Sequence, residues 1–236
     1  MNLTLQYFGK IAELDWSDLD ALKRCYKIQV ASNRWPTEDF FAVMKSVVEW
    51  NWNRIVPHLN LVKIKKVVDV GSGVAIFDLM LSQYIDAVFH LVDKSAFESG
   101  AGPVYYSDNH GFYNSWNVVT DAIRTSGLAA DRFNFIGPVD EWPTEVDLVI
   151  SMHSWCWHYP KDTYWKKALH SLKTGGYLVL DIIHLPNRDM ITEISNEFGV
   201  APILTTPLFP RQNHPFTKWH VLKNGSHGTT CIWVKP

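Results

Sequence analysis

The sequence is poor in cysteine and in charge, and it lacks any long apolar run. Its three cysteines, Cys25, Cys156 and Cys231, are widely spaced, and no Cys-x-x-Cys pair occurs. This odd and scattered set argues against a disulfide framework and against a structural zinc site. No apolar stretch approaches the roughly 20 residues that cross a bilayer, and the N-terminus has no charged-then-apolar signal pattern. We therefore expect a soluble, cytoplasmic protein without a membrane partner.

Charged residues make up only 19% of the chain, and the formal net charge at pH 7 is −2. Because proteins that bind phosphate backbones usually carry a basic face, nucleic acid is not an expected partner. Apolar residues reach 47%, which predicts a globular chain with a large core. The 11 tryptophans fit either an ordinary core or an aromatic-lined binding site, and composition does not separate the two.

Apolar periodicity predicts a helical extension or lid over residues 1–60 and alternating strands and helices over 61–236. The expected strands are 64–70, 87–92, 133–136, 146–151 and 177–183, followed by a candidate at 200–205 and a hairpin of 218–223 with 229–234. The expected helices are 76–83, 116–126, 161–172 and 189–198, the third ending at a Gly175-Gly176 turn. This alternation predicts an α/β fold with a doubly wound, mainly parallel sheet and an antiparallel C-terminal hairpin.

The stretch VVDVGSGVAIF, residues 67–77, has the pattern of a strand, a glycine turn and a helix. Gly71 and Gly73 permit positive φ angles and a close approach of the backbone to a ligand. A dinucleotide fingerprint requires Gly or Ala where Ile76 stands, which disfavours a dehydrogenase. Asp69 lies two residues before Gly71, where a carboxylate would repel a diphosphate and would suit a cationic group.

Asp93 lies twenty residues after Gly73, at the end of the next expected strand. A carboxylate in that place commonly binds a ribose diol. With Asp69 and the two glycines, it describes a nucleoside ligand that carries positive charge and no phosphate. S-adenosyl-L-methionine meets this description.

These residues resemble the Asp-x-Gly-x-Gly turn and following acid of class I S-adenosylmethionine-dependent methyltransferases, over roughly residues 63–235. The resemblance implies a seven-stranded Rossmann-like methyltransferase fold in which Asp69, Gly71 and Gly73 lie at the methionine portion and Asp93 binds the ribose. Asp140, after the third strand, falls where the family contacts adenine, and Ser151 ends the fourth strand beside the cofactor. The family usually has a further small residue in the turn, which Val74-Ala75 matches imperfectly.

The stretch VISMHSWCWHYP, residues 149–160, follows the fourth strand and therefore lies at the ligand-binding edge of the expected sheet. A metal site is not expected, because no second cluster supplies the ligands that His153, Cys156 and His158 would lack. The stretch also lacks the Asn-or-Asp, Pro, Pro, aromatic motif of methyltransferases that act on the amino groups of bases. It resembles a Ser-Trp-x-aromatic-His-Tyr-Pro run in the group labelled sugar O-methyltransferases.

This resemblance implies methyl transfer to an oxygen of a saccharide or another small polar acceptor. A general base would help, because a protonated hydroxyl is a poor nucleophile, and histidine titrates near neutrality. His158 is the first candidate for this base and His153 the second, although each could instead hold the turn together. Trp155 and Trp157 could stack on a sugar or on adenine. The alternatives left open are an RNA or nucleotide methyltransferase and a non-catalytic, S-adenosylmethionine-binding scaffold subunit.

Overall fold

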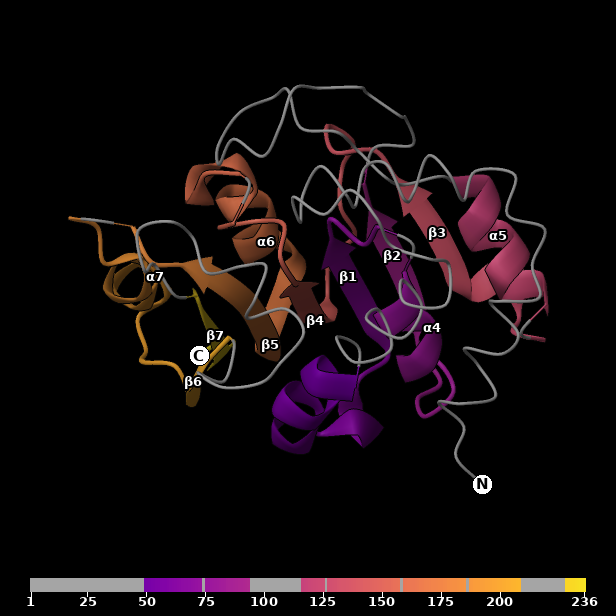
Figure 1. The fold of residues 1–236 in the computed structure, drawn as a ribbon, viewed down its shortest axis with the longest axis horizontal. Helices are drawn as coiled ribbons and strands as arrows, with labels where there is room; N and C mark the ends of the chain where they lie inside the picture. Colours follow the sequence, from indigo (N-terminus) through magenta and orange to yellow (C-terminus); the bar gives the residue numbers. More distant parts are fainter. Residues whose placement is uncertain are drawn as a thin grey trace, which may run out of the picture.

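The alternating strands and helices of the chain form one seven-stranded sheet in the order β3-β2-β1-β4-β5-β7-β6 (Figure 1). The computed structural model describes residues 49–73, 75–93, 116–125, 127–157, 159–185, 187–208 and 228–236. The strands are β1 (Lys66–Val70), β2 (Val88–Val92), β3 (Phe133–Ile136), β4 (Val146–Ser151), β5 (Leu172–Ile183), β6 (Leu204–Pro207) and β7 (Gly228–Val234).

Strands β1 to β5 pair in parallel, and β7 runs antiparallel between β5 and β6. The predicted fold class, a doubly wound and mainly parallel sheet with an antiparallel C-terminal pair, is confirmed. The strand order reverses between β1 and β4, so the connections that leave these two strands pass to opposite sides. Ligands of open α/β sheets bind outside the carboxyl ends of the strands at such a reversal.

Helices cover both faces of the sheet, as Figure 1 shows. They are α4 (Ile76–Leu81), α5 (Trp116–Thr125), α6 (Trp165–Ser171) and α7 (Met190–Phe198), with short 3-10 turns at Val56–His58, Leu61–Lys63, Ala130–Arg132 and Lys161–Thr163. One apolar cluster joins α4, α5 and Ile55 to one face, and a second joins α6 and α7 to the other. Neighbouring residues of β1, Val67 and Val68, belong to different clusters because successive side chains of a strand point to opposite faces.

The predicted end of the helix after residue 161 is wrong in one respect. The helix stops at Ser171, and β5 begins at Leu172, so Gly175 and Gly176 lie inside the strand and not in a helix-ending turn. The pairing of β4 with β5 is irregular between Val146 and Leu148. An added Cβ at Gly176 would lie 2.9 Å from the carbonyl oxygen of Val146. Gly176 therefore permits a close approach of β4 and β5.

At the C-terminal side, β6 starts four residues later than the strand predicted at 200–205. The predicted strand 229–234 is confirmed within β7, whereas its expected hairpin partner, 218–223, lies outside the described residues. The partners of β7 are β5 and β6. Residues 1–48 of the predicted N-terminal extension also lie outside the described ranges, and residues 49–55 are helical, as expected ahead of Pro57.

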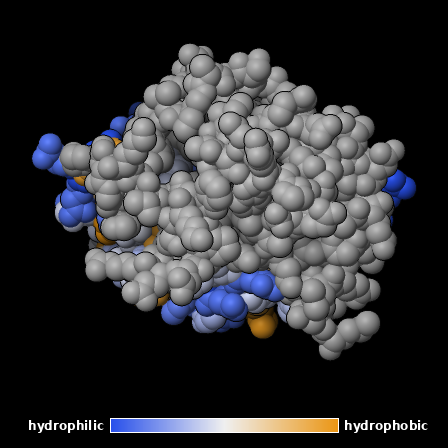
Figure 2. Space-filling view, viewed as in Figure 1, coloured by the Kyte–Doolittle hydropathy of each residue, from blue (hydrophilic) through white to orange (hydrophobic). Residues whose placement is uncertain are grey.

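The described surface on the face drawn in Figure 2 is mainly hydrophilic, with isolated hydrophobic atoms. The large apolar side chains that are exposed, such as Val62, Val139 and Ile203, come from separate elements. Scattered exposure of this kind is normal for a globular protein. Within the described residues, every helix is too short or too polar to cross a membrane.

We expect Gly176→Ala to lower the free energy of unfolding by about 2 kcal/mol, because its new methyl group meets two backbone oxygens that cannot move separately from the sheet. Gly127→Ala is the control, since its Cβ would meet open space and only its positive φ of 67° opposes the change. Urea denaturation of both variants measures the difference. An equal loss in the two variants would contradict the close packing at Gly176.

Candidate functional site

The glycine turn connects the carboxyl end of β1 to α4 and is held against the end of β2. Gly71 and Gly73 adopt φ angles of 73° and 56°, a region that favours glycine. The N–H of Gly71 donates to the Val92 oxygen at 2.7 Å, and the N–H of Gly73 donates to Oδ2 of Asp93 at 2.7 Å. The predicted acid of the second strand therefore lies directly beside the predicted glycine turn.

The residue before α4 completes this turn in an unexpected conformation. Ala75 has a φ of 53°, which is left-handed and uncommon for a residue with a Cβ. The chain thus adopts at this position a conformation for which glycine is better suited. The small side chain of Ala75 is consistent with the expectation of a further small residue in the turn.

The stretch after β4 packs onto the glycine turn. A Cβ added to Gly71 would overlap the side chain of Ser154, so no other residue fits there without a shift. Ser151 ties the same parts together, because its hydroxyl donates to the Val70 oxygen at 2.7 Å and accepts from the Trp155 N–H at 2.9 Å. These contacts join the two strands at which the strand order reverses.

Ser151 and Asp140 were both predicted to contact the cofactor. In the structure, their side chains form hydrogen bonds with the backbone of the protein. Ser151 is fully buried, and its hydroxyl serves the two hydrogen bonds to Val70 and Trp155. Asp140 is exposed in the turn after β3, where its Oδ2 accepts from the N–H of Gly137 at 2.9 Å. Their contact with a cofactor stays a prediction.

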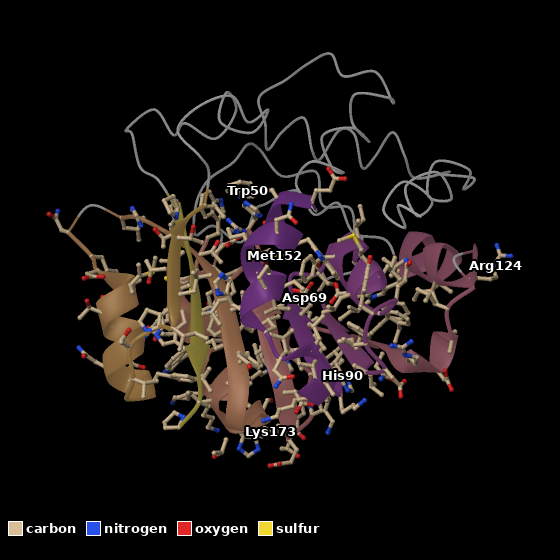
Figure 3. All side chains as sticks on the ribbon, turned by 90° about the horizontal axis from the view of Figure 1, so that it is seen from below. Trp50, Asp69, His90, Arg124, Met152 and Lys173 are labelled. Carbon is tan, nitrogen blue, oxygen red and sulfur yellow. The ribbon has the colours of Figure 1, made fainter. Side chains whose placement is uncertain are left out.

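Asp69 is buried at the end of β1 and faces a second buried carboxyl, that of Asp78 on α4. Burial first, and then the neighbouring carboxyls of Asp78 and Asp93, raise the pKa of Asp69 well above its usual value. Burial also raises the pKa of Asp78, to about 6. Figure 3 shows that Asp69 lies toward the same end of the sheet as Met152, the residue after β4, and away from Lys173 at the start of β5.

Asp78 was not among the predicted site residues. The signal in the sequence is a single carboxylate inside the apolar helix Ile76–Leu81, and its side chain is fully buried. Since burying a charge without a partner is costly, such a residue requires an explanation.

The expectation that Trp155 and Trp157 stack on a ligand is wrong. Both indoles lie in the core, with exposed fractions of 0% and 2%. The Nε1 of Trp155 donates to the Lys161 oxygen at 2.7 Å, and Trp157 packs against Gly228 at the start of β7. Both tryptophans therefore pack in the core next to the end of β4 and are not exposed to a ligand.

His153 emerges from this stretch beside a carboxylate. Its Nδ1 lies 3.5 Å from Oδ2 of Asp181, which belongs to β5, and its side chain keeps 20% of its surface exposed. His153 has a positive φ of 56°, and Cys156 one of 63°. Such conformations store strain and are common at functional sites. His158, the other predicted base, lies outside the described residues.

Asp181 is fully buried and is compensated by several donors. Arg54, from the helix before Pro57, lies 3.3 Å from its Oδ1, and the Thr230 hydroxyl of β7 donates to the same oxygen. Burial raises the pKa of Asp181, while Arg54, Thr230 and the backbone N–H of His153 oppose that rise. The donors thus hold a carboxylate next to the imidazole of His153.

The residues at this edge of the sheet form two groups, which we call the first centre (Asp69, Asp78 and Asp93) and the second centre (His153 and Asp181). Asp69, Asp78 and Asp93 gather carboxylates beside the glycine turn, and no lysine or arginine of the described ranges forms an ion pair with Asp69 or Asp78. That set suits a ligand with a cationic group and hydroxyls and does not suit a diphosphate. His153 and Asp181 lie at the ends of the next strands and provide a histidine supported by an acid.

Comparison with known proteins supports the architecture at low sequence identity. No family model matches the chain, and no curated protein matches it. Residues 961–1257 of StiE O-MT are 15% identical with a TM-score of 0.58, covering 89% of this chain and 80% of that one. Magnesium protoporphyrin IX methyltransferase (ChlM) from Synechocystis PCC 6803, with bound SAM, is 14% identical with a TM-score of 0.55, covering 94% and 93%.

A third similar structure is the [4+2]-cyclase SpnF, 14% identical with a TM-score of 0.56 over 81% of each chain. The chain has the Rossmann-like methyltransferase fold. Since one fold carries different activities, the function of this chain has to be argued from its site.

We expect Gly71→Ala to destabilise the protein by about 3 kcal/mol, from strain at positive φ together with overlap with Ser154. Removing the obstructing side chain in the double variant Gly71→Ala, Ser154→Gly should recover part of this loss. Thermal unfolding of the single and double variants and of Ser154→Gly measures the coupling. Strictly additive effects would show that the turn does not depend on Ser154.

Proposed function

We propose that this chain is an S-adenosylmethionine-dependent methyltransferase that methylates an oxygen of a sugar-like or other small polar acceptor. The observation that carries the proposal is the glycine turn with Asp69 before it and Asp93 beside it, at the carboxyl ends of β1 and β2. The fold supports it, as do similar structures that include a methyltransferase with bound SAM.

The residues fit this cofactor in charge and in hydrogen-bonding type. Asp93 provides a carboxylate for a ribose diol, and the carboxyl of Asp69 favours the ammonium of the methionine portion. The three carboxyls of Asp69, Asp78 and Asp93 would repel a phosphate group, which fits a nucleoside without phosphates. When bound, S-adenosylmethionine would supply an electrophilic methyl group on a sulfonium.

His153 is the described residue suited to prepare the acceptor. The Nδ1 of His153 lies 3.5 Å from Oδ2 of Asp181, and this acid favours the tautomer in which Nε2, itself a buried atom, is the basic nitrogen, as well as the imidazolium that forms. His153 Nε2 would take the proton of the acceptor hydroxyl as its oxygen attacks the methyl group. His158 stays the other proposed base.

The RNA methyltransferase alternative is less well supported, because the net charge of −2 does not provide a general attraction for phosphates. A scaffold that binds S-adenosylmethionine without turnover shares the prediction for cofactor binding. The scaffold and the enzyme are distinguished by the methyl-transfer assay below, in which a scaffold would show no turnover.

Titration of the protein with S-adenosylhomocysteine by calorimetry tests the cofactor. We expect binding by the wild type and affinity about 10- to 100-fold weaker in Asp93→Ala, which loses hydrogen bonds to a charged group. Asp86→Ala is the matched control, because Asp86 is an exposed acid ahead of the other end of β2 and should leave affinity unchanged. Absence of binding by the wild type would remove the basis of the proposal.

Methyl transfer from labelled S-adenosylmethionine to a panel of saccharides and small polar alcohols tests the reaction. We expect His153→Ala to lower kcat by about 10²- to 10⁴-fold while S-adenosylhomocysteine still binds, because only proton transfer is lost. His170→Ala, an exposed histidine at the end of α6, is the control.

Added imidazole should restore part of the activity of His153→Ala, an effect that a purely structural histidine would not show. Full activity in His153→Ala would exclude this base and leave His158 to be tested. Cofactor binding without transfer to any acceptor of the panel, and without transfer to RNA tested beside it, would favour the scaffold.

A further inference from the structure

A pair of buried carboxyls lies under the glycine turn. Asp69 has an exposed fraction of 3% and Asp78 of 0%, and the two carboxyls face each other from β1 and α4. Among the described residues, no side chain outside the pair donates a hydrogen bond to Oδ1 of Asp69 or to either oxygen of Asp78; the pair's own contact is between the two carboxyls. Three buried carboxylate oxygens thus lack a side-chain donor from the rest of the described chain, although buried polar groups are almost always satisfied.

The surroundings do not compensate this charge. Among the described residues, the charged groups that act on the pair are the two carboxyls themselves and Asp93 after β2, which disfavours ionisation further. No lysine, arginine or histidine in the described ranges forms an ion pair with either carboxyl. Two like charges this close in a dry site cannot both be ionised at low cost.

The packing of α4 does not explain Asp78. Its helix neighbours Phe77, Leu79 and Met80 all belong to the apolar cluster on this face, where an apolar side chain would be less costly than a carboxyl. Asp181 offers a partial contrast within the same protein, because Arg54 and Thr230 donate to its Oδ1. Asp78 differs in that both of its oxygens lack a side-chain donor outside the pair among the described residues, which indicates a ligand that brings one.

We propose that Asp69 and Asp78 share one proton in the empty site and release it when a ligand ammonium group binds. In the empty site one carboxyl donates its proton to the other carboxylate. Binding leaves two carboxylates facing one ammonium, and the proton passes to solvent, so charge and atoms balance. The release of the proton on ligand binding rests on the proposed function, because the methionine portion of S-adenosylmethionine or S-adenosylhomocysteine provides the ammonium.

Asp78 thereby becomes a positioning residue of the cofactor site that acts through Asp69. Cofactor affinity should rise with pH by up to tenfold per unit while the pair still holds its proton, and become constant once the pair is ionised. The site would then bind its cofactor less tightly in mildly acidic conditions.

The release of the proton is counted by titrating the wild type with S-adenosylhomocysteine at pH 6.5 in phosphate and in imidazole. The difference between the two heats, divided by the difference in buffer ionisation enthalpy, gives the number of protons; we expect about one. Asp78→Asn should release clearly fewer protons, because the neighbouring carboxyl that helps to raise the pKa of Asp69 is lost. Asp147→Asn is the control and should match the wild type, since Asp147 is a buried acid that accepts from the backbone N–H groups of Lys65 and Lys66 at the opposite end of β1.

The shared proton is tested without ligand by thermal unfolding between pH 4 and pH 8. Both carboxyls hold protons more tightly in the folded protein than in the unfolded chain, where Asp titrates near 3.8. The wild type therefore loses stability as pH rises from that value through about 6, the pKa of Asp78, and beyond. We expect the Tm of Asp78→Asn to equal that of the wild type near pH 4 and to exceed it by about 5 °C at pH 8.

The outcomes separate the two proposals. Binding of S-adenosylhomocysteine by the wild type without proton release would overturn the linkage and leave the methyltransferase proposal intact. Failure of the wild type to bind would overturn both the linkage and the cofactor, and the unfolding series would still decide whether the proton is shared. A Tm difference that does not change with pH would overturn the shared proton itself.

Discussion

The contact between the ends of β1 and β4 is the constraint on which both centres of the site depend. Ser151 bridges the Val70 oxygen and the Trp155 N–H, and Ser154 fills the space that a side chain at Gly71 would need. Because the glycine turn and the stretch after β4 support each other, a shift in one would move Asp69 and His153 together. The strand reversal thus positions the residues proposed for the cofactor and for the acceptor from opposite sides of the same junction.

The two centres solve the problem of a buried acid differently. Burial raises the pKa of Asp181 as well, but Arg54, Thr230 and the backbone of His153 oppose that rise and place the acid beside the imidazole. No cation or hydroxyl of the described residues opposes the rise at Asp69 and Asp78, where burial raises both pKa values. A compensated carboxylate orients a neighbour, whereas an uncompensated pair keeps the capacity to respond to a positive charge from outside.

The fold carries less functional information than these side chains. StiE O-MT, a magnesium protoporphyrin methyltransferase and a [4+2]-cyclase all resemble the chain at 14–15% identity. A shared sheet brings strand ends together, but the residues at those ends determine the chemistry. Asp69, Asp93 and His153 therefore support the proposed methyl transfer, and the resemblance of the stretch after β4 supports the proposed acceptor class.

The sequence by itself determined the order of the elements and the position of the glycine turn, because apolar periodicity and the glycine pattern act locally. It also indicated Asp93, whose spacing from Gly73 reflects one strand and one helix. Only the tertiary structure decided that Trp155 and Trp157 are core residues, that Gly175 and Gly176 lie in a strand, and that Asp78 faces Asp69. These outcomes depend on contacts between segments far apart in the chain, for which neither local propensity nor composition carries a signal.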